Sequence, residues 1–318
     1  MRLFLTGASG FVGHHLAAAF RSAGWDVSAL VRTRSSVSAL RELGVELVQG
    51  DLLAGESFAD ALAGSDLVIH CAGLIRAVTV EEYRRVNVDG AGVVAATASR
   101  VGMPRFILIS SIAARGPLGG SDPAPVSHYG TSKREGEKRV FEKAGGMSVC
   151  VIRPPVIYGP RDSGMLSVFK AARFGLFPMY GRGGHRLSIV HVDDLVRAIQ
   201  LVAARPGDLP SGPFYPEDGT NPSWSELAQA FAAALGKKIR RIPLPPFLFY
   251  GLAGLATGWS LLVRRPVLFS LDKVREMSCP DWTASHKDLT RLVGYKPQIP
   301  LVRGLGETAR WYRRQGWL

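Results

Sequence analysis

The feature that most constrains this chain is a glycine-rich turn between an apolar segment and a helical pattern at its start. Residues 2–6 are mostly apolar, helical periodicity begins at residue 11, and the letters TGASGFVG join the two. Gly7 can adopt the tight turn, Gly10 lets backbone approach a pyrophosphate, and Gly13 lets the helix pack closely. Because a helix N-terminus offers free N–H groups and partial positive charge, the turn predicts a dinucleotide site.

The first 150 residues contain short apolar runs that alternate with helical patterns. The runs lack the polar alternation of half-exposed strands, which is typical of parallel strands buried on both faces. We therefore predict an α/β fold with a doubly wound parallel sheet of the Rossmann type. Strands are expected at 2–6, 26–31, 46–49, 67–70, 106–110 and 148–153, and helices at 11–23, 37–43, 58–63, 80–100 and 129–143.

The alternation stops after residue 155, where Gly- and Pro-rich joints separate helical patterns. These helices are expected at 165–174, 192–204, 224–235 and 301–315. We predict a Rossmann domain over 1–160, to which a segment near 187–204 returns. Residues 161–318 are expected to form mainly a smaller, mostly helical C-terminal substrate lobe.

The composition is globular, with 47% hydrophobic and 20% charged residues among 318. The net charge of +13 divides into +2 for residues 1–150 and +11 for 151–318. Such an excess suits an anionic ligand, an anionic membrane or nucleic acid, or is a solvated basic face. The cysteines, Cys71, Cys150 and Cys279, lack pairing or metal spacing. We expect buried free thiols, no metal site, and a cytoplasmic protein without a secretory signal.

The end of the second strand bears on the choice of cofactor, because a Rossmann fold reads the adenosine ribose there. Arg32 and Arg34 follow this strand, in place of the acidic residue that binds the ribose hydroxyl groups of NAD. A guanidinium suits a 2′-phosphate, so the sequence favours NADP over NAD. Asp51, beside Leu52 after the third strand, is expected to accept a hydrogen bond from the adenine amino group.

A tyrosine and a lysine four residues apart lie in YGTSK at 129–133, inside a helical pattern. This spacing places Tyr129 and Lys133 on one face of a helix, where the ammonium is expected to lower the tyrosine pKa. Ser111 ends the fifth strand, at the sheet edge that faces the ligand in open α/β folds. Its hydroxyl is expected to hold the reacting oxygen while Tyr129 exchanges the proton.

Taken in order, these motifs resemble the extended branch of the short-chain dehydrogenase/reductase superfamily. The glycine turn and the Ser, Tyr and Lys residues match that family's cofactor turn and catalytic set. Further matches are HCAG at 70–73, Asn87 in NVDG, RPPVIYGP at 153–160 and HVDD at 191–194. The resemblance covers nearly the whole chain.

The resemblance implies that Ser111, Tyr129 and Lys133 are catalytic and that Lys133 also bonds the nicotinamide ribose. It implies a homodimer formed through the helices at 80–100 and 129–143. With the turn and the ribose-reading residues, the expected cofactor set is Gly7, Ser9, Gly10, Phe11, Val12, Gly13, Arg32, Asp51, Leu52, Ala72, Gly73, Asn87, Tyr129, Lys133, Pro154, Val156 and Ile157.

Two departures from the family pattern concern the substrate. Nucleotide-sugar epimerases and dehydratases of this branch usually carry an asparagine at the position of Pro155, and proline cannot donate that bond. They also often carry an Arg-Asp pair before HVDD; here Arg186 has no acid beside it, although Arg182 or Arg186 could still bind a diphosphate. Both departures resemble the dihydroflavonol-reductase and 3β-hydroxysteroid-dehydrogenase members.

Residues 242–263 contain no charged side chain and are flanked by basic residues on both sides. The flanks are Lys237, Lys238, Arg240 and Arg241 before the segment and Arg264 and Arg265 after it. Three interpretations stay open: a membrane span, a peripheral element on an anionic bilayer, and a buried helix or wall of the substrate pocket.

The sequence therefore predicts an NAD(P)-dependent oxidoreductase that interconverts an alcohol and a ketone on a hydrophobic or lipid-like substrate. One alternative is a nucleotide-sugar epimerase or dehydratase that retains NAD. A second alternative is a non-catalytic cofactor-binding or RNA-binding protein, although we find no aromatic stacking platform for a nucleic acid.

Overall fold

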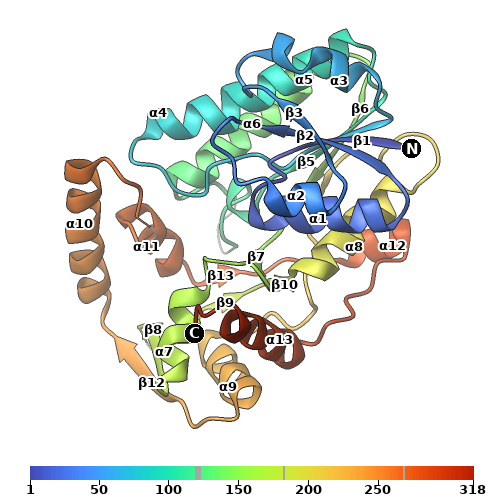
Figure 1. Cartoon of the computed structure of the whole chain (residues 1–318). Coiled ribbons are helices and arrows are strands. Elements are labelled where there is room, and N and C mark those ends of the chain that lie inside the picture. The colour runs from blue at the N-terminus through green and yellow to red at the C-terminus, as the bar shows by residue number, and fades with distance from the viewer. Residues whose placement is uncertain (119–122, 182, 268) are drawn as a thin grey trace.

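The computed structural model describes residues 1–118, 123–181, 183–267 and 269–318. Its centre is a parallel sheet of seven strands in the order β11-β6-β5-β4-β1-β2-β3 (Figure 1). The strands are β1 (Arg2–Thr6), β2 (Asp26–Val31), β3 (Glu46–Gln49), β4 (Leu67–His70), β5 (Arg105–Ile109), β6 (Ser148–Ile152) and β11 (Pro213–Phe214). The predicted doubly wound fold is confirmed, and the first six strands match their expected ranges within one residue at each end.

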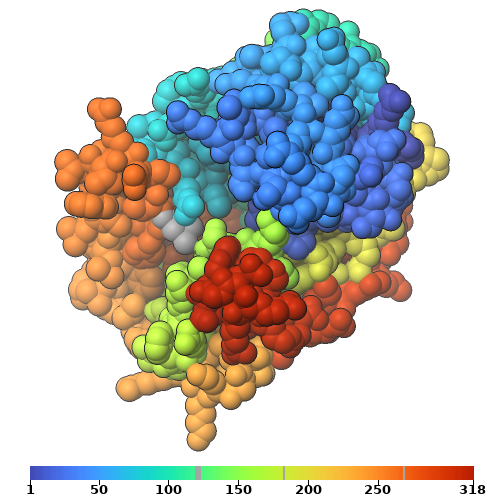
Figure 2. All heavy atoms as spheres, in the orientation of Figure 1, coloured from blue at the N-terminus to red at the C-terminus, as the bar shows by residue number. Residues whose placement is uncertain are grey.

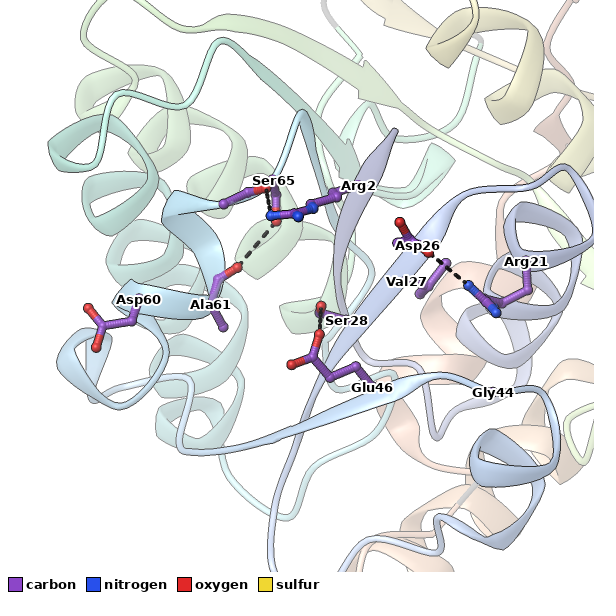
Figure 3. Close-up of a pocket in the computed structure, with 11 residues that line it drawn as sticks. Arg2, Arg21, Asp26, Val27, Ser28, Gly44, Glu46, Asp60, Ala61 and Ser65 are labelled. Carbon is purple, nitrogen blue, oxygen red and sulfur yellow. Dashed lines mark hydrogen bonds and ion pairs between the residues drawn. The ribbon is translucent and has the colours of Figure 1, made fainter.

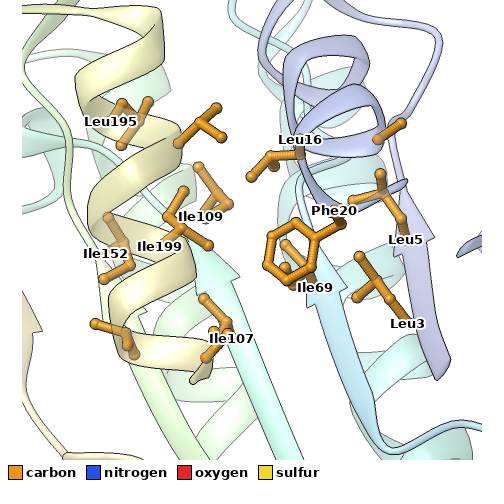
Figure 4. Packing of buried hydrophobic residues seen from close by; sticks show 14 of the residues in the cluster. Leu3, Leu5, Leu16, Phe20, Ile69, Ile107, Ile109, Ile152, Leu195 and Ile199 are labelled. Atoms are coloured by element: carbon orange, nitrogen blue, oxygen red, sulfur yellow. The ribbon is translucent and has the colours of Figure 1, made fainter. Parts of the chain in front are cut away.

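Each central strand buries alternate side chains on opposite faces of the sheet. In β1, Leu3 and Leu5 join one core and Phe4 joins the other. On the first face, α1 (Phe11–Ser22) and α8 (Val192–Ala203) lie side by side and pack on the strands (Figure 4). The smaller helices α2 (Ser38–Glu42) and α12 (Lys287–Val293) add to this core. Each fully buried leucine or phenylalanine side chain contributes roughly 1.5–3 kcal/mol to the free energy of folding.

The second face of the sheet is covered by α3 (Ala59–Ala63), α5 (Ala91–Arg100) and α6 (His128–Lys143). The single helix expected over 80–100 is instead α4 (Val80–Tyr83), a π-helical segment Arg84–Gly90, and α5. Such π segments inside α-helices frequently occur at functional sites.

A second body lies beyond the carboxyl ends of the parallel strands, in the lower part of Figure 1. Its helices are α7 (Leu166–Arg173), α9 (Trp224–Leu235) and α13 (Leu301–Arg314), and its core contains Phe169, Phe177, Phe231 and Tyr312. Three two-stranded sheets complete it: β7 (Val156–Tyr158) with β10 (Ile189–His191), β8 (Leu176–Tyr180) with β12 (Arg240–Leu244), and β9 (Arg186–Leu187) with β13 (Asp281–Trp282).

The charge-free segment 242–263 is divided between the end of β12 and the helix α10 (Pro246–Val263). Phe249 and Ala253 of α10 pack against Val274 of α11 (Leu271–Ser278). Only 17% of α10 is buried, so the interpretation of this segment as a buried helix is wrong. Its 18 residues, with a mean hydropathy of 1.4, are long and apolar enough to cross a membrane by length and composition.

Candidate active site

The glycine-rich turn brings β1, α1 and the end of β4 into close contact. Gly7 has a φ of 78°, and a Cβ atom there would lie 2.6 Å from the backbone nitrogen of Ala72. A Cβ atom at Gly13 would lie 2.0 Å from the carbonyl oxygen of Gly7. Because only glycine fits both positions, the turn is bound tightly to the loop after β4. This junction of β1 and β4 is where the strand order reverses, the usual ligand crevice of such sheets.

The first turn of α1 fits a pyrophosphate. The helix begins at Gly10 with no side-chain cap from the described residues and no acidic residue in its first turn. Its N-terminal N–H groups can therefore bind an anion from the ligand side. Ser9 and Gly10 are exposed, while Phe11 and Val12 are half-buried.

Beneath the turn, a buried hydrogen-bond chain fixes the loop that carries Ala72 and Gly73. The backbone nitrogen of Ala72 donates to Thr6 Oγ1 at 3.2 Å, and Thr6 Oγ1 lies 2.8 Å from His70 Nδ1. Thr6 Oγ1 thus joins the His70 ring to the loop after β4. Burial, with the charge of Lys133, lowers the His70 pKa to about 3 and keeps the ring neutral. Sequence analysis noted HCAG but assigned no role to Thr6 or His70.

The residues expected to bind the adenosine lie where β2 and β3 finish side by side. Arg32 is exposed, and its backbone nitrogen donates to Ser35 Oγ at 3.1 Å, which fixes the turn after β2. Asp51 is also exposed, but its Oδ1 accepts from the backbone nitrogen of Leu53 at 2.9 Å. Leu52 is half-buried against the second core.

Tyr129, Lys133 and Ser111 come together where β5 ends and α6 begins. Tyr129 is half-buried in the first turn of α6. Lys133 is buried one turn later, and its Nζ donates to the carbonyl oxygen of Ile109 at 2.8 Å. Ser111 Oγ accepts from the backbone nitrogen of Ala113 at 3.2 Å, which orients the hydroxyl at the strand end.

Burial dominates the electrostatics of this trio. It raises the Tyr129 pKa to about 12, while interaction with the Ser111 hydroxyl lowers that pKa and Glu276 raises it. Burial also lowers the Lys133 pKa, whereas the nearby Cys71 and Glu137 raise it. The expectation that Lys133 lowers the Tyr129 pKa is corrected, because the ammonium is directed at the Ile109 carbonyl and not at the phenol.

Asn87, an expected cofactor contact, makes three hydrogen bonds within the protein. Its side chain is buried: Oδ1 accepts from the backbone nitrogen of Leu74 at 2.7 Å, and Nδ2 donates to Leu74 O and Ser132 Oγ. These bonds use its polar atoms, so Asn87 joins the loop after β4 to α6 and stands behind the cofactor surface.

The loop that leads into β7 lies next to the Ser111 turn. Pro154 is buried and its carbonyl oxygen accepts from the backbone nitrogen of Ile112 at 2.9 Å. Val156 is exposed and Ile157 is half-buried. Of the two arginines considered for a diphosphate, Arg186 lies 3.8 Å from Glu226, and Arg182 lies outside the described residues.

Helix α11 contributes two carboxylates that sequence analysis missed. Asp272 accepts from the backbone nitrogens of His128 and Tyr129 at 2.7 and 3.2 Å. Glu276 Oε1 accepts from Ser127 Oγ at 2.6 Å, and Ser127 in turn caps α6. The N-terminus of the helix that carries Tyr129 is therefore held by α11. No local motif could have indicated contacts between residues more than 140 positions apart.

A buried ion pair, also missed, supports α6 from the other side. Arg153 Nη2 lies 2.5 Å from Glu137 Oε2, and Arg153 Nη1 donates to the Tyr215 hydroxyl at 2.9 Å. Ser110 donates to the same carboxylate. The pair joins the end of β6 to α6, so the site is held on rigid elements.

A recess of about 520 Å³ lies at the opposite edge of the sheet, among the first residues of β1, β2 and β3. Its side chains pair with one another: Arg21 with Asp26, and Ser28 with Glu46 (Figure 3). In open α/β sheets ligands bind at the carboxyl ends of the strands. We therefore place the active site at the glycine turn and not in this recess.

Comparison with known proteins identifies the family of this chain. Residues 3–215 match the family model "NAD dependent epimerase/dehydratase family". A ceramide reductase of Caulobacter vibrioides is 37% identical over 316 residues, 99% of this chain and 95% of the relative. A 3-beta-hydroxysteroid dehydrogenase of Mycolicibacterium neoaurum is 27% identical, covering 98% of this chain and 91% of that enzyme.

Among solved structures, MoeE5 in complex with UDP-glucuronic acid and NAD is similar in fold, with a TM-score of 0.77 at 23% identity. The match covers 99% of this chain and 100% of that one. The motifs, the sheet order and the family match agree, and the prediction of an enzyme is confirmed. The chain belongs to the NAD-dependent epimerase/dehydratase family, within the extended short-chain dehydrogenases/reductases.

Proposed function

We propose that this protein interconverts an alcohol and a ketone on a lipid-like substrate of the ceramide kind. The observation that carries the proposal is the 37% identity to a ceramide reductase, which extends over nearly the full length of both chains. The exposed apolar helix α10 supports the same substrate class.

A reduced nicotinamide cofactor, held at the glycine turn, would supply the hydride for the carbonyl carbon of the substrate. The hydroxyl group of Ser111 binds the carbonyl oxygen, and Tyr129 Oη donates the proton that completes the alcohol. We assign Lys133 to the nicotinamide ribose. Asp272 holds the N-terminus of the helix that carries Tyr129 and Lys133, and Asn87 joins this helix to the loop after β4.

The test is NADPH and NADH oxidation with a keto-ceramide in mixed micelles. Activity is expected for the wild-type chain and is expected to fall by about 10²–10⁴-fold in Tyr129→Phe, because the proton donor is lost. Tyr83→Phe is the matched control, since its ring centroid lies 6.1 Å from that of Tyr129 and it loses the same group. Full activity in Tyr129→Phe would refute the mechanism.

For the cofactor we propose NADP, supported by the exposed Arg32 directly after β2. A charged hydrogen bond to the 2′-phosphate contributes about 1.5–3 kcal/mol. Arg32→Ala should therefore weaken NADPH binding by roughly 10–100-fold. NADH binding, measured by the same fluorescence titration, should change little. An equal loss for both cofactors would exclude this selectivity.

The alternative is a nucleotide-sugar epimerase or dehydratase, favoured by the fold of the UDP-glucuronic acid complex. Pro155 speaks against it, because this buried residue offers no N–H group or side-chain donor to a diphosphate. NAD released on denaturing the purified protein, together with turnover of UDP-sugars, would support the alternative.

We also propose a homodimer through the helices over 80–100 and α6. Light scattering of the purified chain would show twice the chain mass. Phe141 is 48% exposed near the end of α6, and the variant Phe141→Glu should lower the measured mass to that of one chain.

A further inference from the structure

Helix α10 presents apolar side chains around almost its whole circumference. Phe249, Ala253 and Ser260 form the buried stripe that faces its own fold. Outside that stripe the exposed side chains are Phe247, Leu248, Tyr250, Leu252, Leu255, Trp259, Leu261 and Leu262. A surface helix of a globular protein normally carries polar residues opposite its buried stripe. A contiguous exposed apolar surface of this kind indicates a site of interaction with a membrane or a protein.

The exposure is large at the positions farthest from the stripe. Leu255 is 75% exposed, Leu262 is 76% exposed and Trp259 is 61% exposed. Figure 2 shows this segment, in orange, at the outer edge of the molecule on the left. The patch therefore projects from the body and can reach a flat surface.

Basic residues adjoin both ends of this apolar helix. Arg240 and Arg241 in β12 precede it, Arg264 and Arg265 follow it, and all four are exposed. The segment from 237 to 265 contains no acidic residue. Cations at both ends of an apolar helix complement an anionic lipid surface, where each basic residue near the headgroups adds attraction.

We propose that α10 docks on an anionic lipid bilayer, with its apolar side chains among the acyl chains and the flanking arginines at the headgroups. The helix lies along the surface and does not cross the bilayer. Its N-terminal side continues from β12, which pairs with β8, and its buried stripe packs against α11. Both neighbours belong to the same folded body, so the two ends of α10 stay on one side.

Helix α10 is connected to the active site through α11, because the buried stripe of α10 packs on α11 and Asp272 of α11 binds the first turn of the helix that carries Tyr129. The docking itself does not depend on the substrate, so its test needs no turnover.

The experiment is co-sedimentation of the full chain with phosphatidylcholine vesicles, prepared with or without phosphatidylglycerol. Binding is expected to be tighter to the anionic vesicles by at least about tenfold and to weaken with salt. Trp259 should give a blue-shifted fluorescence change that Trp259→Phe removes. Failure to bind either vesicle would overturn the proposal.

Two double variants test the two parts of the surface. Leu255→Glu with Leu262→Glu should lower binding to both vesicles by at least about tenfold, while Val302→Glu, at a 43% exposed apolar position on α13, should not. Arg264→Gln with Arg265→Gln should remove most of the preference for anionic vesicles. The matched control is Arg313→Gln with Arg314→Gln, an exposed pair at the end of α13.

Self-association through α10 is the competing outcome. If the leucine double variant changes the mass measured by light scattering and leaves vesicle binding unchanged, the patch binds a second copy and the lipid proposal is overturned. Near-wild-type circular dichroism of the variants is expected, because both leucines are mostly exposed.

Discussion

Burial shifts the pKa values of two titratable groups in this site, Tyr129 and His70, so that both favour their neutral forms. Tyr129 is pushed towards the phenol form and His70 towards the neutral ring, in both cases mainly by loss of water. The interaction with the Ser111 hydroxyl lowers the Tyr129 pKa and so opposes the effect of burial. The sign of each effect gives a pH dependence that can be measured.

Removing the Ser111 hydroxyl should move the pH profile of the reaction. In the proposed mechanism, alcohol oxidation uses the Tyr129 phenolate as base, so its rate should rise with pH through the Tyr129 pKa. Because Ser111 lowers that pKa, Ser111→Ala should shift the rise to higher pH, and Ser111→Thr should restore it. The kcat/KM profile for oxidation measures this. An unshifted Ser111→Ala profile would contradict the assigned interaction.

His70 should make the fold sensitive to mild acid. Its pKa falls from 6.5 to about 3 on folding, so below pH 6.5 the unfolded chain binds a proton that the folded chain does not. Stability should therefore fall with decreasing pH by up to about 1.4 kcal/mol per unit. Urea unfolding between pH 7 and 4.5 measures the slope. His70→Asn, although less stable at pH 7, should show a shallower slope than the wild type.

At the scale of elements, strands buried on both faces were predictable because their apolar runs are continuous, as in β1 and β5. The short β11 was missed because two residues beginning with Pro213 give no such run. The π segment at 84–90 was missed because its letters, RRVNVDG, fit an ordinary helix. The anchoring of α6 by α11 was beyond prediction, since it depends on how the second body returns to the sheet.

The Asp272 cap on α6 should influence catalysis more than substrate binding. Asp272→Ala removes the acceptor for the backbone nitrogens of His128 and Tyr129, so stability should fall by about 0.5–2 kcal/mol. The kcat should fall while KM changes little, and Asp272→Asn should recover part of it. Thermal unfolding and steady-state kinetics measure both effects.

Ser270→Ala is the matched control for this cap. Ser270 caps α11 itself through the backbone nitrogen of Lys273, so its loss should lower stability without a comparable loss of kcat. Equal kinetic effects of the two variants would mean that Asp272 has only a structural role.

At the scale of the molecule, motif order was enough to locate the cofactor turn and the Tyr-Lys helix. The order of motifs could not show that α10 projects from the body, because an apolar, charge-free segment has the same sequence pattern whether it is buried or exposed. The basic excess of the second half became interpretable only after Arg264 and Arg265 were found beside the exposed face of α10. Three-dimensional packing thus excludes a buried helix, one of the interpretations that composition left open.

The two bodies are joined by a buried carboxylate on α8. Asp194 is fully buried, accepts from the backbone nitrogens of Gln298 and Ile299, and lies 2.5 Å from Arg197. Because α8 packs on the sheet and residues 298–299 lead into α13, Asp194 ties the C-terminal helix to the Rossmann body. Its loss should therefore affect the whole molecule.

Asp194→Ala should destabilise the chain by about 3–5 kcal/mol, because it leaves two backbone N–H groups without their buried acceptor and the half-buried Arg197 without its carboxylate partner. The exposed pair Asp288–Arg291 on α12 has the same i,i+3 spacing, at 2.8 Å, and serves as the control. Asp288→Ala should cost less than about 1 kcal/mol, since water replaces the lost partner. Urea unfolding followed by tryptophan fluorescence measures both. Equal losses would mean that burial of Asp194 adds nothing to the connection between the bodies.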